Sequence, residues 1–220
     1  MAGLRRYRRI GPFYDLISME RMLYAAPRRR LLSLMSLMSP HPGATVVDVG
    51  CGTGLNFAGL HQTVGPTGHI VGIDSSPSML AAAEKRIRHQ HWTNITTLHG
   101  DIEHLLPALE AAGVRLDDVD ALIATYVIST LHNAGHFWDA VDHLCARRQR
   151  LIAIADIGRP NTTRHLCGLG LRTLSALGGS QPHCQPWNDL VARSKHATVE
   201  THLGGHVRLA VGYSTEPVHG

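Results

Sequence analysis

The chain has 220 residues, of which 44% are hydrophobic and 17% are charged. This length supports a full hydrophobic core without disulfides, and the apolar content excludes collagen-like, low-complexity and disordered proteins. No apolar run approaches the roughly 20 residues that cross a bilayer, so no membrane-spanning helix is expected. The net charge of +4 is unevenly placed, because residues 1–30 carry eight arginines against two acids and the remainder is slightly acidic.

The N-terminal segment, residues 1–39, is predicted to be helical in pieces and to form a lid ahead of one globular unit at residues 40–220. Pro27 is typical of the first turn of a helix. The residues after it form one apolar stripe at helical spacing: Leu31, Leu34, Met35 and Met38. A turn rich in Pro and Gly at residues 40–43 ends this helix.

From residue 44 onward, short β-branched segments alternate with amphipathic helices. Five segments are predicted as parallel strands: residues 44–49, 69–74, 94–98, 119–125 and 150–156. Ser76 and Pro77 suit the N-cap and the first position of the helix that follows the second strand. Strands that alternate with helices of about 10–15 residues are typical of βαβ units.

The C-terminal end breaks this alternation. Residues 199–203 and 206–212 are strand-like, and only Gly204 and Gly205 lie between them, which predicts an antiparallel hairpin. The whole pattern therefore predicts an α/β fold. We expect a Rossmann-like, doubly wound and mostly parallel seven-stranded sheet with a C-terminal antiparallel hairpin and an N-terminal helical lid.

The cysteines and histidines indicate no metal centre. Four cysteines show no short paired spacing and no secretory signal precedes them, so a reduced cytosolic chain is favoured. His132 and His136 lie one helical turn apart, with Asp139 close behind. Without an HExxH or Cys/His box, histidines on a solvated helix face are favoured there over a metal site.

The most informative segment, Val46–Gly54, runs from a buried strand into three glycines at alternate positions: Gly50, Gly52 and Gly54. Such glycines permit positive φ and let a ligand approach the backbone near a helix N-terminus. A nicotinamide dinucleotide site has the pattern GxGxxG, but Leu55 stands at its third glycine and Asp48 would repel a pyrophosphate. A carboxylate there suits a ligand with an ammonium group. A P-loop is excluded because no Gly-Lys-Ser/Thr follows.

Two further acids end the next two predicted strands. Asp74 follows Gly54 by twenty residues, where a carboxylate can accept both ribose hydroxyls, and Asp101 ends the third strand. Since the carboxyl ends of parallel strands meet at one edge of a sheet, Asp48, Asp74 and Asp101 are expected to line one ligand site. The alternative is that Asp74 and Asp101 only cap turns, as isolated aspartates commonly do.

The glycine loop and the three acids resemble motif I and the following acidic positions of class I S-adenosylmethionine-dependent methyltransferases. Further segments are similar to the branch that contains quinone-ring methyltransferases and bacterial phosphatidylethanolamine N-methyltransferases: residues 13–15, 52–57, 74–80, 185–187 and 204–205. The resemblance covers most of the chain. It is specific for the cofactor and weak for the methyl acceptor.

For the cofactor S-adenosylmethionine, the resemblance implies one contact region for each part of the molecule. Asp48 and the loop backbone would hold the methionine part, Asp74 the ribose and Asp101 the adenine edge. The residues implied to bind the cofactor are Asp48, Gly50, Cys51, Gly52, Gly54, Asn56, Asp74, Ser75, Met79, Asp101, Ile102 and Thr125.

For the acceptor, the resemblance and the chemistry suggest only a few candidates. Tyr126 would lie near the sulfonium methyl, Tyr14 would cover the site as part of the lid, and Trp187 would anchor a loop of the acceptor pocket. His132 is the candidate general base, with Tyr126 as an orienting group, because histidine is readily poised near neutral pH. Packed aromatic residues and a surface histidine are the alternative interpretations of these side chains.

Departures from the family pattern narrow the acceptor. Arg147-Arg148-Gln149-Arg150 replaces the usual Pro-Gly-Gly turn before the fifth strand. No Asn/Asp-Pro-Pro-Tyr/Phe follows the fourth strand, which argues against nucleic-acid and glutamine-amide N-methyltransferases. The arginines at residues 5–9 would form a basic helix face suited to anionic lipid, or a solvated tail, and no nucleic-acid-binding motif accompanies them.

The predicted function is therefore transfer of a methyl group from S-adenosylmethionine to a hydrophobic small molecule or a lipid head group. A non-catalytic module that binds S-adenosylmethionine is one alternative, and a nicotinamide-dependent oxidoreductase is a less favoured one. The chain is expected in the cytoplasm, at the membrane surface where the arginines bind anionic lipid.

Overall fold

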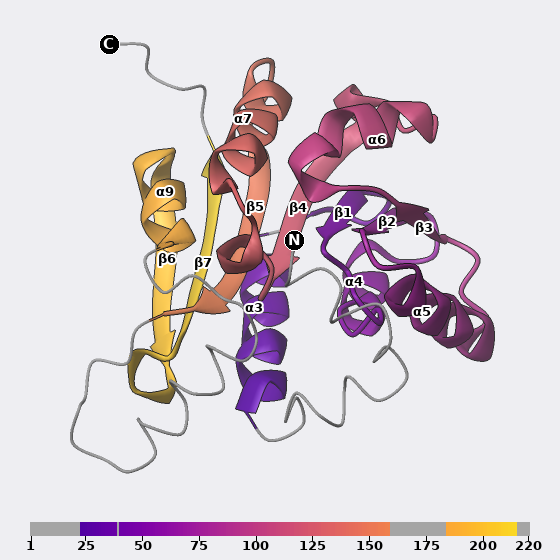
Figure 1. Ribbon diagram of the computed structural model, residues 1–220, viewed down its shortest axis with the longest axis horizontal. Coiled ribbons are helices and arrows are strands. Elements are labelled where there is room, and N and C mark those ends of the chain that lie inside the picture. The colour runs from indigo at the N-terminus through magenta and orange to yellow at the C-terminus, as the bar shows by residue number, and fades with distance from the viewer. Residues whose placement is uncertain (1–22, 39, 159–183, 215–220) are drawn as a thin grey trace.

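A seven-stranded sheet with the strand order β3-β2-β1-β4-β5-β7-β6 forms the centre of the protein (Figure 1). The structure is a computed structural model that describes residues 23–38, 40–158 and 184–214. The strands are β1 Thr45–Val49, β2 His69–Asp74, β3 Ile95–His99, β4 Val119–Thr125, β5 Arg150–Ile157, β6 Ser194–His202 and β7 Val207–Ser214. β1 to β5 pair in parallel, and β7 pairs antiparallel with both β5 and β6. The predicted fold class is confirmed.

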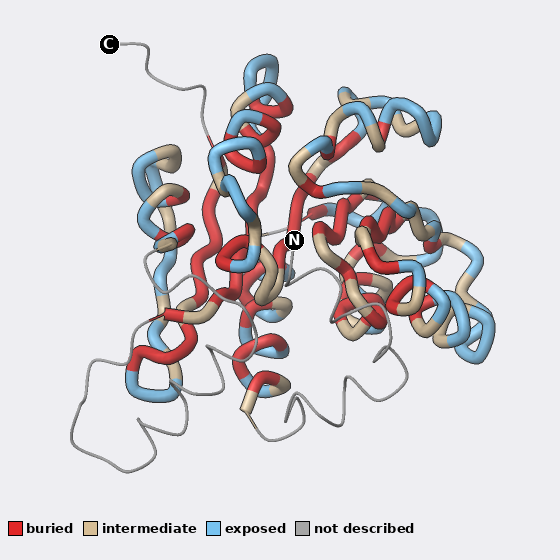
Figure 2. The backbone as a smooth tube through the Cα atoms, viewed as in Figure 1, coloured by how far each residue is buried: buried red, intermediate tan, exposed pale blue. Residues whose placement is uncertain are grey.

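Helices cover both faces of the sheet. One face carries α3 Ala25–Met38, α4 Phe57–Val64 and α5 Pro77–Gln90, and the other carries α6 Leu105–Ala111, α7 Ala134–Cys145 and α9 Pro186–Ala192. Short 3₁₀ turns lie between these elements: η3 Ile102–His104, η4 Leu116–Asp118, η5 Ile128–Thr130 and η6 Leu203–Gly205. With both faces covered, the central strands are buried along nearly their whole length, shown in red in Figure 2.

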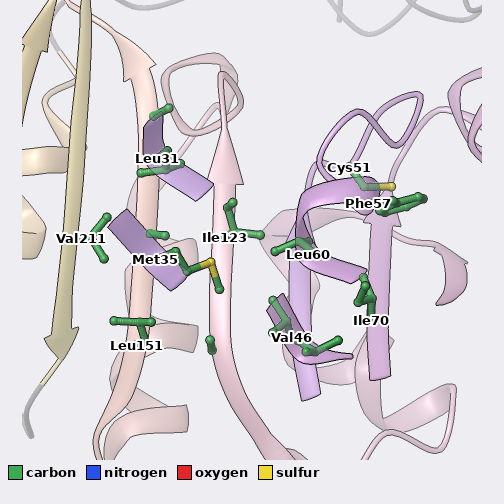
Figure 3. Packing of buried hydrophobic residues seen from close by; sticks show 14 of the residues in the cluster. Leu31, Met35, Val46, Cys51, Phe57, Leu60, Ile70, Ile123, Leu151 and Val211 are labelled. Carbon is green, nitrogen blue, oxygen red and sulfur yellow. The ribbon is translucent and has the colours of Figure 1, made fainter. Parts of the chain in front are cut away.

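The side chains of each strand alternate between the two hydrophobic cores. Val46 of β1 packs toward α4 and its neighbour Val47 packs toward the opposite face. In the first core, Leu31 and Met35 of α3 lie over β4, β5 and β7, whereas Leu60 of α4 lies over β1 and β2 (Figure 3). The helix α3 is thus packed directly on the sheet by the apolar stripe that the sequence indicated.

The starts of α3 and β6 differ from the sequence-based expectation. α3 begins at Ala25, so that Pro27 falls within its first turn, where a missing N–H costs no helical hydrogen bond. β6 begins at Ser194, five residues before the predicted start. Its early residues, such as Lys195 and His196, are exposed on an edge strand and carry no apolar alternation. Within the described ranges, no helix is both long and apolar enough to span a membrane.

Candidate functional site

Three side chains from separate elements meet at the carboxyl edge of the sheet. Asp48, the penultimate residue of β1, is fully buried. Its Oδ1 accepts a hydrogen bond of 2.9 Å from Nδ2 of Asn56. The same amide group donates to Oγ1 of Thr125 at the end of β4, over 3.1 Å. The sequence predicted each of these residues as a cofactor contact, and the structure places them in one network.

This network leaves two buried acceptor atoms unused. Oδ2 of Asp48 and Oδ1 of Asn56 are buried and have no hydrogen-bond donor within the part of the chain that the structure describes. Buried polar atoms in proteins are nearly always paired, so this position fits a ligand that brings N–H donors. Burial raises the pKa of Asp48 to about 7, with the charge of Asp74 adding to the rise, whereas the Asn56 hydrogen bond and the Arg28 guanidinium oppose it. A cationic ligand would favour the carboxylate form.

The glycine loop behind this network serves both packing and access. Gly50, Gly52 and Gly54 all have positive φ. A Cβ on Gly50 would lie 2.5 Å from Cγ2 of Val127. The Val127 side chain therefore leaves no room for any residue larger than glycine at position 50. A Cβ on Gly52 would meet nothing within 4 Å, so the backbone there is open to a ligand. Between them, Cys51 is buried, and burial raises the pKa of its thiol.

Asp74 ties the end of β2 to the glycine loop. Its Oδ2 accepts a 2.9 Å hydrogen bond from the N–H of Gly52, and its Oδ1 accepts one of 2.8 Å from the N–H of Ser76. A carboxylate offers about four acceptor positions, so one on each oxygen remains for a ligand hydroxyl. Burial is also the main cause that raises the pKa of Asp74.

The remaining predicted cofactor residues lie along β2 and β3 at the same edge. Asp101 is exposed and caps η3, because its Oδ1 accepts the N–H of Glu103 at 3.0 Å. Asp74 and Asp101 therefore do cap turns, as the alternative interpretation held, and each keeps acceptor positions for a ligand. Met79 and Ile102 are buried beside this edge, and the carbonyl oxygen of Ser75 accepts a hydrogen bond of 3.2 Å from Nε2 of His99.

A second cluster lies beyond β4, on the side where the methyl acceptor was predicted. Tyr126 has the left-handed φ of 60°, a strained conformation for an aromatic residue. Its hydroxyl donates to the backbone oxygen of Tyr24 at 3.2 Å, and the centroids of the two rings are 4.8 Å apart. Oη of Tyr24 in turn lies 3.1 Å from Nε2 of His206. The guanidinium carbon of Arg28 is 5.5 Å from the Tyr126 ring centroid.

Tyr24, Arg28 and His206 were not predicted from the sequence as site residues. Two signals were present in the sequence. Tyr24 and Arg28 continue the inward stripe of Leu31 and Met35 at spacings of four and three residues, so a tyrosine and an arginine share a buried helix face. His206 directly follows the Gly204-Gly205 turn and is fully buried, which lowers its pKa.

The other predicted acceptor-side residues have different surroundings. His132 is exposed in the loop before α7, where its backbone N–H donates to Oε1 of Glu103 at 3.0 Å. Trp187, in the first turn of α9, is buried, and the guanidinium carbon of Arg208 lies 5.0 Å from its ring centroid. Tyr14 and the N-terminal arginines at residues 5–9 lie outside the described residues.

The fold and this arrangement agree with comparisons to known proteins. Residues 40–158, more than half of the chain, match the family model described as a methyltransferase domain. The chain therefore belongs to this family, as a class I S-adenosylmethionine-dependent methyltransferase with S-adenosylmethionine as methyl donor. The nicotinamide interpretation is set aside by this match.

Individual relatives are similar over parts of their length. An arsenite methyltransferase of Halobacterium salinarum is 37% identical over 77 residues, which cover 35% of this chain and 20% of that protein. A demethylmenaquinone methyltransferase of Listeria welshimeri is 28% identical over 101 residues, 45% of this chain and 42% of that protein. The matches thus span less than half of these curated relatives. The crystal structure of an S-adenosylmethionine-dependent methyltransferase from Aquifex aeolicus aligns over 90% of this chain and 93% of its own, with TM-score 0.57 and 15% identity, and shows the shared fold.

Proposed function

We propose that this protein transfers a methyl group from S-adenosylmethionine to a hydrophobic small molecule, with the ring of a reduced quinone as the first candidate acceptor. The observation that carries the cofactor part is the pair of buried oxygens without donors, Oδ2 of Asp48 and Oδ1 of Asn56. An ammonium group supplies three N–H donors and a positive charge, which fits a buried carboxylate paired with an amide.

Different residues at the carboxyl edge of the sheet would bind different parts of the cofactor. Asp48 and Asn56 would hold the ammonium group of the methionine part, the open backbone at Gly52 would lie along it, and Asp74 would accept the two ribose hydroxyls. The adenine would lie over β3, with the remaining predicted contacts around it: Ser75, Met79, Asp101 and Ile102. When bound, the cofactor supplies a methyl group on a sulfonium, which is transferred by direct displacement. The protein's own task is to orient the acceptor, exclude water and remove a proton.

The acceptor side supports an aromatic ring. The ring centroids of Tyr24 and Tyr126 lie 4.8 Å apart, Tyr126 directly follows Thr125, and aromatic side chains favour contact with a flat ring. Demethylmenaquinone methyltransferases are among the relatives of this chain. A phosphatidylethanolamine head group is the second candidate, since eight arginines within residues 1–30 suit an anionic membrane surface. Tyr14 as a lid residue and Trp187 as an anchor of the acceptor loop stay our predictions.

Two measurements on the purified chain test this proposal. Calorimetry with S-adenosylhomocysteine tests the cofactor, and absence of binding would overturn the assignment. Labelled S-adenosylmethionine is then supplied with demethylmenaquinol in detergent, with phosphatidylethanolamine vesicles, or with arsenite and glutathione. Label in demethylmenaquinol supports the first candidate, and label in lipid supports the second. Binding of S-adenosylhomocysteine without label transfer to these probes or to any cell-extract fraction would indicate a non-catalytic module.

A further inference from the structure

His206 is a buried histidine whose ring makes one polar contact within the described residues. It directly precedes β7, whose first residue, Val207, pairs with Ile157 at the carboxyl end of β5. The residue is 0% exposed, and Nε2 lies 3.1 Å from Oη of Tyr24. Nδ1 is buried with no partner in the described part of the chain. The antiparallel insertion of β7 thus brings a histidine to the edge of the sheet where the cofactor residues gather.

Tyr24 connects this histidine to the cofactor network. Its ring lies 4.8 Å from that of Tyr126, and Tyr126 directly follows Thr125, which shares the Asn56 amide with Asp48. Tyr24 is 8% exposed whereas His206 is 0% exposed, so within this pair the tyrosine is the member that keeps some accessible surface. The inference below rests on the proposed methyl transfer.

We propose that Tyr24 and His206 form a proton relay for the methyl acceptor, which would be a molecule with an ionisable O–H, such as a phenol or hydroquinone. The O–H bond of the acceptor breaks and its proton passes to Oη of Tyr24, while the proton of Tyr24 passes to Nε2 of His206. For an acceptor methylated on oxygen, the freed electron pair forms the bond to the methyl carbon as the methyl–sulfur bond breaks. For a hydroquinone methylated on its ring, that pair shifts into the ring, a ring carbon forms the bond to the methyl group, and the hydrogen on that carbon then returns to the oxygen as a proton, which restores the aromatic ring. The products are the methylated acceptor, neutral S-adenosylhomocysteine and a protonated His206.

The environment of His206 suits this role. Burial lowers its pKa, so the ring is neutral at pH 7 and has a lone pair to offer. A neutral tyrosine hydroxyl is a very weak base and cannot hold a second proton. Transfer onward to an imidazole removes this difficulty, because an imidazole, even with a lowered pKa, is a far stronger base than that hydroxyl. His132, the base predicted from the sequence, is exposed and makes no comparable contact with Tyr126 among the described residues.

The alternative role for this hydrogen bond is purely structural, as a contact that docks α3 on the sheet. The chain offers a matched control for that alternative. The hydroxyl of Tyr213 on β7 donates to the backbone oxygen of Met38 over 2.7 Å, so it fixes the other end of α3. Tyr24→Phe and Tyr213→Phe each delete one hydroxyl between α3 and the sheet. Only the first deletion lies at the cofactor edge.

The kinetic experiment uses demethylmenaquinol and S-adenosylmethionine with the full chain. Tyr24→Phe and His206→Gln are each expected to lower kcat about 30- to 100-fold, with KM for S-adenosylmethionine unchanged. The double variant is expected to be no slower than either single variant, because the two residues act as one unit. Tyr213→Phe is expected to keep kcat. A kcat within threefold of wild type for Tyr24→Phe, or equal losses in Tyr24→Phe and Tyr213→Phe, would overturn the relay.

A second measurement is independent of the acceptor. Nitrogen NMR of the imidazole distinguishes the two neutral tautomers, and the relay requires the proton on Nδ1 with Nε2 accepting from Tyr24. Tyr24→Phe is expected to shift the Nε2 resonance because it removes that donor. A proton on Nε2 at pH 7 would overturn the relay. Should wild type methylate none of the probes, the proposed function fails, and this experiment still decides whether Tyr24 donates to Nε2 of His206, the arrangement that the relay requires.

Discussion

The cofactor side and the acceptor side of this site are built in different ways. On the cofactor side, most of the polar groups come from one stretch of the chain, Asp48 to Asp101, at or close after the carboxyl ends of β1, β2 and β3, and Thr125 ends β4. On the acceptor side, Tyr126 lies 102 residues after Tyr24, and His206 lies 80 residues after Tyr126. These three residues are brought together by the topology of the sheet. A local motif can be found by its spacing, whereas a site assembled from distant elements requires the fold to be known first.

The two sides also differ in their electrostatics. Burial favours the neutral form of both groups, since it raises the pKa of Asp48 and lowers that of His206. A cationic ligand reverses this effect for Asp48 alone, because its charge stabilises the carboxylate. The cofactor side is therefore arranged to attract a positive charge, and the acceptor side is arranged to keep a neutral base. The predictions that follow test this contrast, starting from the largest expected effect.

Asp48→Asn is expected to separate binding from stability. Loss of the buried carboxylate should weaken S-adenosylhomocysteine binding about 100-fold by calorimetry, because an ammonium would lose its charged partner. At pH 8 the variant should melt at a higher temperature. In the folded protein the pKa of Asp48 is about 7, which lies above its ordinary value of 3.8. The protonated carboxyl therefore contributes its full stability below pH 3.8, and this contribution is lost as the pH rises through 7. An amide avoids that loss. Unchanged binding, or a lower melting temperature at pH 8, would contradict this account.

Cofactor binding should depend on pH through the same carboxyl. As pH falls through the pKa of about 7, Asp48 becomes neutral in the free protein, despite the opposing effects of Arg28 and the Asn56 hydrogen bond. The affinity for S-adenosylhomocysteine is therefore expected to fall about tenfold between pH 7 and pH 5.5. Asp48→Asn supplies the control, since its remaining weak binding should not vary over this range. A wild-type affinity that stays flat would show that another group holds the ammonium.

Two glycines in the loop offer a matched pair of substitutions. Both Gly50 and Gly52 have positive φ, so alanine at either position is strained by about 1–2 kcal/mol. Gly50→Ala also forces a Cβ to within 2.5 Å of Val127, and we expect an additional loss of stability of about 1–3 kcal/mol. Gly52→Ala has no protein neighbour within 4 Å and should instead weaken S-adenosylhomocysteine binding about tenfold. Melting and calorimetry distinguish the two, and a larger stability loss at Gly52 would contradict the open backbone.

The same contrast explains how far the sequence could predict the molecule. The parallel strands and the hairpin follow from apolar periodicity and turn residues, and β2 and β4 match their predicted ranges. Asp48, Asn56 and Asp74 are predictable because a strand and a glycine loop fix their distances along the chain. The contact of Tyr24 with His206 is not, because it depends on where β7 enters the sheet. The prediction of His132 as a base rests on its position seven residues after Thr125. Two residues joined by a loop can be close in sequence without being close in space.

The smallest effect is expected at the surface contact between α3 and the edge strand. Arg30 donates to Glu200 of β6 through both Nε and Nη2, and its side chain is 45% exposed. Because exposed ion pairs contribute little and α3 is held by buried Leu31 and Met35, Arg30→Gln should change the melting temperature by no more than about 2 °C. Binding of S-adenosylhomocysteine should not change, since the hydrogen bonds that join Asp48, Asn56 and Thr125 come from elements other than α3. A fall in turnover with unchanged binding would show that this pair also sets the position of Tyr24, and that the acceptor side depends on the whole of α3.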